Sequence, residues 1–223
     1  MPQSRAPAFL LVAALAAGAI AAETPKKAPT TRPAATKAVA GKEVSLFDGK
    51  TLTNWQKTEF GGEGDVTVEN GTIVVASGST LSGVTWKGPD LPTMDYEVTL
   101  DANRLEGSDF FVGLTFPVDK SHASLVLGGW GGSLVGISSV NGFDAANNET
   151  AGVKDFKNKQ WYHVRLRVTK DKIQAWVDDE KITDLETTDK EISTRADIDA
   201  SKPFGLATYQ TKAAYKNITV RKL

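Results

Sequence analysis

A single large aromatic residue, Trp130, lies between four glycines in the segment Gly128-Gly129-Trp130-Gly131-Gly132. Glycines on both sides permit close approach of the backbone to its neighbours and leave the indole open. An exposed, flat, apolar ring suits the apolar face of a pyranose. Trp130 is therefore the first candidate for a substrate-binding residue. The alternative is a tryptophan that closes one end of the hydrophobic core.

The polar loop at residues 141–150 is dense in amides and carboxylates. Such side chains bind sugar hydroxyls well, and loops often carry function. We expect Asp144 and Asn148 to bind substrate and Glu149 to act in catalysis, with Gln210, near the end of the chain, as a further substrate contact. Asn and Asp also form turns by bonding their own backbone, which is the alternative interpretation of this loop.

Glu106, Asp109 and His122 are the remaining candidates for catalysis. Glu106 and Asp109 lead into an aromatic strand expected over residues 110–116, and His122 begins the next strand. Antiparallel neighbours would bring the three side chains into one groove. A carboxylate or an imidazole there could act as a general base. A lone histidine at the start of a strand is also typical of a surface or hydrogen-bonded residue.

Other carboxylates offer two further kinds of site. Asp95 and Glu97 would lie about 7 Å apart on one face of a strand, a separation that inverting glycosidases use. Any solvated strand face produces the same row of polar residues. Oxygen ligands for a divalent metal such as calcium could come from Asp197, Asp199 or the Asp144 loop. No spacing matches a known metal-binding loop, so the metal ligands stay unassigned.

The elements that must position these residues are strands. From Val44 onward, short runs with period-two alternation are separated by Gly, Asn, Asp and Pro, without a helical stripe. Asn70-Gly71 between two apolar runs predicts a hairpin. Further strands are expected at 81–86, 95–102, 109–116, 123–128, 133–139, 161–169, 172–178, 181–185, 204–209 and 215–222. The predicted fold class is all-β, a two-sheet antiparallel β-sandwich of jelly-roll type.

The hairpin from Trp161 to Ile182 has the clearest register. Tyr162, Val164, Leu166 and Val168 alternate on one face, which we expect to be core. On the other face Arg165 would lie opposite Trp176 and could stack on its indole. We interpret this pair as structural, with a sugar platform as the alternative.

The ends and the composition of the chain restrict its location and partners. Residues 1–22 contain Arg5 and an apolar run that ends in small residues, which predicts a signal peptide, with an uncleaved membrane anchor as the alternative. Residues 23–42, rich in Pro, Thr, Ala and Lys, predict a disordered linker before a domain at 43–223. We expect a secreted or periplasmic protein without a membrane span after signal cleavage. A net charge of −1 gives no indication of nucleic-acid binding, and the absence of cysteine excludes disulfides and thiolate metal sites.

Several segments in order resemble one bacterial family. They are Leu46-Phe47-Asp48-Gly49-Lys50-Thr51-Leu52-Thr53-Asn54-Trp55, the strand Tyr96-Glu97-Val98-Thr99-Leu100, the hairpin from Trp161, and the ending at residues 215–223. Together they resemble the 3-keto-disaccharide hydrolase domain, which is grouped with concanavalin A-like lectins and glucanases. The resemblance covers roughly residues 43–223 and implies a concanavalin A-like jelly roll with a carbohydrate ligand.

The resemblance also implies a reaction, the cleavage of glycosidic bonds of 3-keto-glycosides. A ketone at C3 acidifies the hydrogen at C2 and permits elimination, which requires a base near C2 and an electrophile for the enolate, such as a divalent metal, an arginine or a histidine. The typical family member has a Gly-Asn-Ser-Gly segment leading to an arginine where this chain has residues 107–116. No catalytic residue can therefore be transferred position by position.

Three functions remain open from the sequence. The first is a hydrolase or lyase acting on 3-keto-glycosides. The second is a carbohydrate-binding module without catalysis, and the third is a structural or adhesion domain of the cell envelope. The chain has no Glu-x-Asp-x-x-Glu strand motif of the glucanases with this fold, which counts against ordinary endoglucanase activity.

Overall fold

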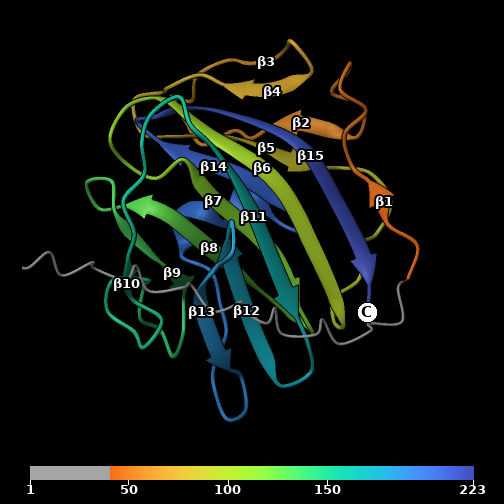
Figure 1. Ribbon diagram of the computed structural model, residues 1–223, viewed down its shortest axis with the longest axis vertical. Coiled ribbons are helices and arrows are strands. Elements are labelled where there is room, and N and C mark those ends of the chain that lie inside the picture. Colours follow the sequence, from red (N-terminus) through yellow and green to blue (C-terminus); the bar gives the residue numbers. More distant parts are fainter. Residues whose placement is uncertain (1–40) are drawn as a thin grey trace, which may run out of the picture. The chain divides into compact units, whose positions relative to one another are not determined.

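The computed structural model describes residues 41–223, and the expected signal peptide and nearly all of the expected linker lie outside this part of the chain. The described residues form two antiparallel sheets that pack face to face, with β6, β11 and β15 in front of β7, β8 and β14 (Figure 1). The first sheet has the order β13-β12-β11-β6-β15-β4-β3, with β1 paired to β15. The second has the order β10-β9-β8-β7-β14-β5-β2. The predicted all-β two-sheet sandwich is confirmed.

The strands of the first sheet are β1 (Val44–Ser45), β3 (Val66–Glu69), β4 (Thr72–Val75), β6 (Tyr96–Glu106), β11 (Trp161–Val168), β12 (Lys172–Val177), β13 (Glu180–Glu186) and β15 (Lys212–Lys222). Those of the second are β2 (Trp55–Lys57), β5 (Leu81–Trp86), β7 (Val112–Val118), β8 (Ser121–Gly129), β9 (Leu134–Ser138), β10 (Gly152–Val153) and β14 (Gly205–Tyr209). One short 3₁₀ helix, η1 (Ala196–Ser201), precedes β14. The sequence pattern did not predict η1, since its six residues are too few to show a helical period.

The core lies between the sheets and consists of the apolar members of each alternating strand. On β11 the buried face is the predicted one, with Val164 and Leu166 fully buried. Two buried tyrosines tie the sheets together through their hydroxyls. Tyr215 of β15 donates to the carbonyl of Phe111 at 2.6 Å, and Tyr96 of β6 donates to the carbonyl of Pro117 at 2.6 Å. Both ends of β7 are therefore held from the opposite sheet.

Two predicted hairpins are present, and the pairing expected for Arg165 in the second of them is confirmed. Asn70 and Gly71 connect β3 to β4 with φ values of 49° and 77°, the left-handed pair that a type I′ turn requires. In the β11–β12 hairpin Arg165 lies opposite Trp176, and its guanidinium carbon is 3.7 Å from the indole centroid. The expected stacking of this pair is confirmed.

The predicted row of carboxylates on β6 is not a free acidic face. Asp95 lies before the strand, in a left-handed conformation with φ of 52°. Glu97 is only 3% exposed and accepts hydrogen bonds from Arg165, Arg167 and Arg221. The alternation of side chains along the strand correctly predicted that Glu97 lies on the outer face. Arginines from β11 and β15, which are distant in sequence, cover it there. The pair does not have the arrangement of glycosidase carboxylates.

The outer face of the second sheet carries small side chains at its centre. Ala207 of β14 is paired with Gly83 of β5 on one side and with Gly113 of β7 on the other. In the next row Ser124 of β8 lies opposite Ser138 of β9. Most large side chains at the centre of these strands point into the core instead, so the sheet leaves a depression on its outer face. No helix among residues 41–223 is long and apolar enough to span a membrane.

Candidate functional site

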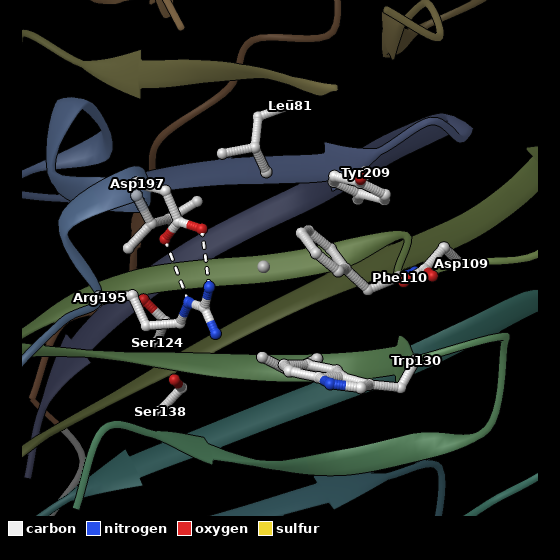
Figure 2. A pocket seen from close by; sticks show the side chains of 12 residues that line it. Leu81, Asp109, Phe110, Ser124, Trp130, Ser138, Arg195, Asp197 and Tyr209 are labelled. Atoms are coloured by element: carbon white, nitrogen blue, oxygen red, sulfur yellow. Dashed lines mark hydrogen bonds and ion pairs between the residues drawn. The ribbon is translucent and has the colours of Figure 1, made fainter. Parts of the chain in front are cut away.

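A cavity of about 400 Å³ occupies this depression (Figure 2). Its floor is formed by Gly113, Ser124, Val126 and Ser138 on three neighbouring strands. Gly113 lets the Phe110 ring pack close against the sheet, because a Cβ there would meet that ring at 3.1 Å. The floor therefore carries two hydroxyl groups, those of Ser124 and Ser138, and the Ser124 hydroxyl also shares a hydrogen bond with that of Thr115 at 3.1 Å.

Aromatic rings form one wall of the cavity. Trp130, in the turn between β8 and β9, is 49% exposed and lies along one edge of the cavity. Phe110 and Tyr209 pack against each other with ring centroids 6.1 Å apart and an interplanar angle of 33°. Leu81 extends this apolar wall from β5. An apolar wall beside a hydroxyl-bearing floor suits a ligand with one apolar face and a polar rim.

The Trp130 loop is held in an uncommon conformation by Asp109. Trp130 has a φ of 48°, which a bulky residue rarely adopts. Oδ2 of Asp109 accepts a hydrogen bond from the backbone N–H of Gly131 at 3.2 Å. Oδ1 accepts one from the N–H of Phe110 at 2.7 Å. One carboxylate thus fixes the backbone beside two of the wall's aromatic rings.

Arg104 supports the same wall from behind. It is 5% exposed, and its guanidinium donates to the carbonyls of Asp109 and Gly132, each at 3.4 Å, and of Phe156 at 2.6 Å. Burial lowers the pKa of Arg104 below its usual value, and the nearby Tyr162 and Asp109 act in the opposite direction. The buried guanidinium therefore joins the Asp109 turn to the Trp130 loop.

The opposite wall is charged and comes from the segment around η1. Arg195 forms a bidentate pair with Asp197, with Nε–Oδ1 at 3.2 Å and Nη2–Oδ2 at 3.1 Å, and Figure 2 shows this pair across the cavity from Phe110 and Tyr209. The Asp197 hydrogen bonds raise the pKa of Arg195 above its usual value. Nη1 of Arg195 also lies 3.3 Å from Oδ2 of Asp144. The guanidinium is thus held between two carboxylates at the cavity edge.

The side chains around this cavity do not fit a divalent metal. Within residues 41–223, no group of three or more His, Asp or Glu side chains is arranged to hold an ion. The metal-ligand candidates from the sequence are paired with cations instead, Asp197 and Asp144 with Arg195 and Asp199 with Lys202.

The structure places two of the predicted site residues, Asp109 and Trp130, in the cavity lining. A third, Asp144, contacts the lining through Arg195. Asn148 lies in the same loop, where its Nδ2 donates to the carbonyls of Ile137, at 2.8 Å, and Asp144, at 2.7 Å. Its side-chain amide therefore holds the loop backbone, which agrees with the alternative that Asn and Asp form turns in this loop.

The other predicted residues lie away from the lining. Glu149 is paired with Lys190, and Glu106, at the end of β6, is 3.9 Å from the ammonium of Lys212. The Nε2 of Gln210 donates to the carbonyl of Ser79 at 2.8 Å. These side chains are engaged with protein groups, and their predicted roles stay predictions.

His122 and Asp109 are not brought into one groove. The β7–β8 register pairs Val112 with Leu127 and Pro117 with His122, so the two residues lie near opposite ends of the hairpin, about 17 Å apart or more. Burial lowers the pKa of His122 below its usual value, and the charge of Lys202 adds to this effect. The imidazole lies at the η1 end of the sheet.

Sequence reasoning missed most of the cavity lining, which includes Leu81, Phe110, Ser124, Ser138, Arg195 and Tyr209. One signal could have indicated the floor. Gly113 and Ser124 alternate with large core residues on adjacent strands, and such alternation indicates a sheet whose outer face is hollow. No comparable pattern marks Arg195.

A two-sheet jelly-roll sandwich with an aromatic cavity on the outer face of one sheet is an architecture of carbohydrate-active β-sandwich domains. The 3-keto-alpha-glucoside-1,2-lyase-like domain family matches residues 42–221, and the chain belongs to this family. The resemblance seen in the sequence is confirmed. No curated protein sequence matches the chain.

Solved structures support the fold. A protein from Parabacteroides distasonis, provisionally described as a glycosyl hydrolase, is 14% identical, with 82% of this chain and 94% of that chain covered and a TM-score of 0.51. A carbohydrate-binding module from Bacillus subtilis is 17% identical, with 76% and 96% covered and a TM-score of 0.50. A Bacillus subtilis protein of unknown function with a galectin-like fold is 11% identical, with 84% and 97% covered and a TM-score of 0.55. At these identities the likeness concerns the fold alone.

Proposed function

We propose that the domain binds a 3-keto-glycoside in the cavity and cleaves its glycosidic bond by elimination across C1 and C2. Family membership supports the reaction class. The observation that carries the assignment to this cavity is the aromatic wall of Trp130, Phe110 and Tyr209 facing the Arg195–Asp197 pair. The aromatic wall would stack on a pyranose ring, and the charged pair would meet its polar edge.

Binding would use both the floor and the walls. The apolar face of the keto sugar would lie against Trp130, while the hydroxyls of Ser124 and Ser138 would bond its ring hydroxyls. Because Asp109 and Arg104 fix the wall before a ligand arrives, little conformational entropy would be lost on binding.

In the chemical step a carboxylate of the charged wall, Asp197, would accept the proton from C2. The electron pair of that C–H bond would form an enolate with the C3 ketone, and Arg195 would stabilise the oxyanion. Return of the electrons would form the C1–C2 double bond and expel the glycosidic oxygen, which takes a proton from water. The product is a conjugated enone, and addition of water across its double bond gives the free 3-keto sugar.

The test follows the absorbance of the enone and the release of the leaving group with purified chain and a 3-keto-α-glucoside. Asp197→Asn should lower kcat by at least about 10²-fold, as expected for loss of a general base. Asp184→Asn is the matched control, since Asp184 is an ion-paired aspartate on the opposite sheet. Equal rates for Asp197→Asn and the wild type would refute the assignment.

The same assay distinguishes catalysis by Asp197 from catalysis by the residues that were predicted from the sequence. Glu149→Gln and a Glu106→Gln, His122→Gln double variant should keep near wild-type turnover if Asp197 is the base. Loss of turnover in either would transfer the chemistry to those residues.

A carbohydrate-binding module without catalysis is the second candidate. It is favoured by the state of the two carboxylates in the lining, since Asp109 accepts from two backbone N–H groups and Asp197 is paired with Arg195. This candidate predicts calorimetric sugar binding without turnover. A domain with neither binding nor turnover would be the structural or adhesion domain.

We further propose that the protein acts after export, in the periplasm or outside the cell. The proposal rests on the apolar N-terminal segment at residues 1–22. Detection of the chain only in the cytoplasm, with its N-terminus uncut, would overturn it.

A further inference from the structure

The outer face of the first sheet, on the opposite side of the sandwich from the cavity, carries three arginines around one buried carboxylate. Arg165 and Arg167 lie on β11 and Arg221 lies on β15, and the strand between them, β6, carries Glu97 (Figure 1). All three guanidinium groups contact the Glu97 carboxylate. We call the three residues the arginine patch. Three positive charges face one negative charge there, so the patch has a positive excess.

Glu97 positions the guanidinium groups and leaves part of each available. Arg167 and Arg221 each use Nε and Nη2 to donate to one oxygen of Glu97, at distances of 2.7 to 3.1 Å. Arg165 donates only through Nη1, at 3.4 Å. Among residues 41–223, Nη1 of Arg167 and Nη1 of Arg221 donate to no protein acceptor, and the three side chains are 27–30% exposed. Since a guanidinium has five N–H groups, donors remain for a ligand.

Charges on the neighbouring strands do not cancel this excess. On β12 and β13, Lys172 and Lys181 are paired with Asp184 and Glu186, which leaves that side balanced. Asp101 lies four residues after Glu97 on β6, about 13 Å along the strand. This distance exceeds the Debye length of about 8 Å at physiological ionic strength. The positive field is therefore concentrated at the patch.

We propose that the arginine patch binds the acidic groups, carboxylate or sulfate, of an acidic polysaccharide. The planar fork of a guanidinium matches two oxygens of such a group, as the pairs with Glu97 already show. Binding by this face would hold the domain on the polymer with the cavity directed away from it. The inference goes beyond the proposed function and does not depend on turnover.

The patch is arranged for a chain of repeated charges. Arg165 and Arg167 are two residues apart on β11, about 7 Å along the strand, and Arg221 lies two strands away, about 10 Å across the sheet. Arg165 is stacked on Trp176, with its guanidinium carbon 3.7 Å from the indole centroid. Because stacking and the Glu97 bonds already order the three side chains, little conformational entropy would be lost on binding.

Other anionic partners fit this face less well. Binding to a membrane surface commonly adds apolar side chains that enter the lipid, but the Trp176 ring lies under Arg165. Binding to duplex DNA depends on many phosphate contacts, and the chain has a net charge of −1 with only a local positive excess. A flexible acidic glycan needs only a few charged contacts at one place. We therefore assign the patch to a polysaccharide.

The test measures calorimetric binding of the purified chain to polygalacturonate and to dextran sulfate, with neutral dextran for comparison. We expect both acidic polymers to bind, with an affinity that falls as ionic strength is raised, and dextran not to bind. Arg165→Gln should raise the Kd about fivefold, the size expected for one charge-assisted contact at a solvated site. This arginine is chosen because Glu97 keeps the bidentate bonds of Arg167 and Arg221 without it.

Three further variants make the test specific. Lys120→Gln is the matched control, since it removes one positive charge from the exposed turn between β7 and β8 and should leave the Kd unchanged. Thr99→Glu places a carboxylate opposite Arg165, keeps all three arginines and should weaken binding as Arg165→Gln does. Trp130→Ala alters the cavity and should not change the affinity for the polymers. Circular dichroism shows whether each fold is intact, and Thr99→Glu decides the result if Arg165→Gln is unfolded.

The outcomes are distinct from those for the proposed function. Loss of affinity in the patch variants with wild-type affinity in Lys120→Gln supports the inference whether or not the protein turns over a 3-keto-glucoside. No binding of either acidic polymer, equal binding of dextran, or equal loss in Lys120→Gln overturns it. Tighter binding to a short DNA duplex, or to vesicles of phosphatidylserine and phosphatidylcholine, also overturns it and assigns the patch to that partner.

Discussion

Removal of the Trp130 ring is the most direct test of the cavity. With 49% of the residue exposed and about 250 Å² as the full area of a tryptophan, about 120 Å² of surface is open. A sugar face would cover about half of this, so at about 25 cal/mol per Å² the ring contributes about 1.5 kcal/mol. Trp130→Ala should therefore raise the Kd for a 3-keto-glucoside about tenfold by calorimetry. Alanine keeps a Cβ, so the cost of the positive φ is largely unchanged.

The control is Trp161→Ala, which removes another half-exposed tryptophan from the opposite sheet. Trp161 is 37% exposed and lies under the ammonium of Lys216, 4.3 Å from its ring centroid. Its loss should leave the Kd within twofold of the wild type. Unchanged binding by Trp130→Ala, or equal loss in both variants, would refute the reasoning that the Trp130 ring binds the sugar.

Two further predictions concern charged groups outside the cavity. Burial would raise the pKa of Glu97, but hydrogen bonds and charges from Arg167 and Arg221 outweigh it and lower the pKa below the usual value. Glu97→Gln should therefore lower the free energy of unfolding, measured in urea near pH 7, by about 3 kcal/mol. This value is at the low end for a broken buried ion pair, because the arginines are partly solvated. The exposed control Asp184→Asn should lower it by about 0.5 kcal/mol, and equal losses in the two variants would contradict a special role for the Glu97 network. The lowered pKa of His122 means that its stabilising contribution is complete above pH 6.5 and is lost as the pH falls below it. His122→Gln should flatten the fall of Tm between pH 7 and 5.5, and an unchanged slope would show that other groups cause it.

The sandwich could be predicted because its signals are local. Alternation along β11 and β12 placed Val164 and Leu166 in the core, and the Asn70-Gly71 pair determined a turn. Each of these features depends on residues a few positions apart. Register within a hairpin follows from the same local pattern, which is why Arg165 could be placed opposite Trp176 in advance.

The candidate site could be predicted only in part because its pairings are long-range. Glu149 and Asp144 look like free carboxylates in the sequence, but their partners, Lys190 and Arg195, come from a segment more than forty residues later. That segment has no strand pattern. It is positioned by Ile198, which packs on the outer face of the second sheet beside Leu81 and Ala207. Nothing in the order of residues indicates which sheet face receives such a segment.

The arrangement of the two walls suggests why acidic residues near the cavity need not act on the substrate. Asp109 anchors the aromatic wall through backbone N–H groups, and Asp144 anchors the charged wall through Arg195. The floor between them belongs to regular strands, which cannot shift without breaking their ladder. The separation of Trp130 from Asp197 is therefore determined before a ligand binds, as the proposed elimination at C2 requires. Asp109 and Asp197 are the two carboxylates of the cavity lining, and only Asp109 holds the backbone of the aromatic wall, so Asp197 is the one whose loss should affect chemistry more than shape.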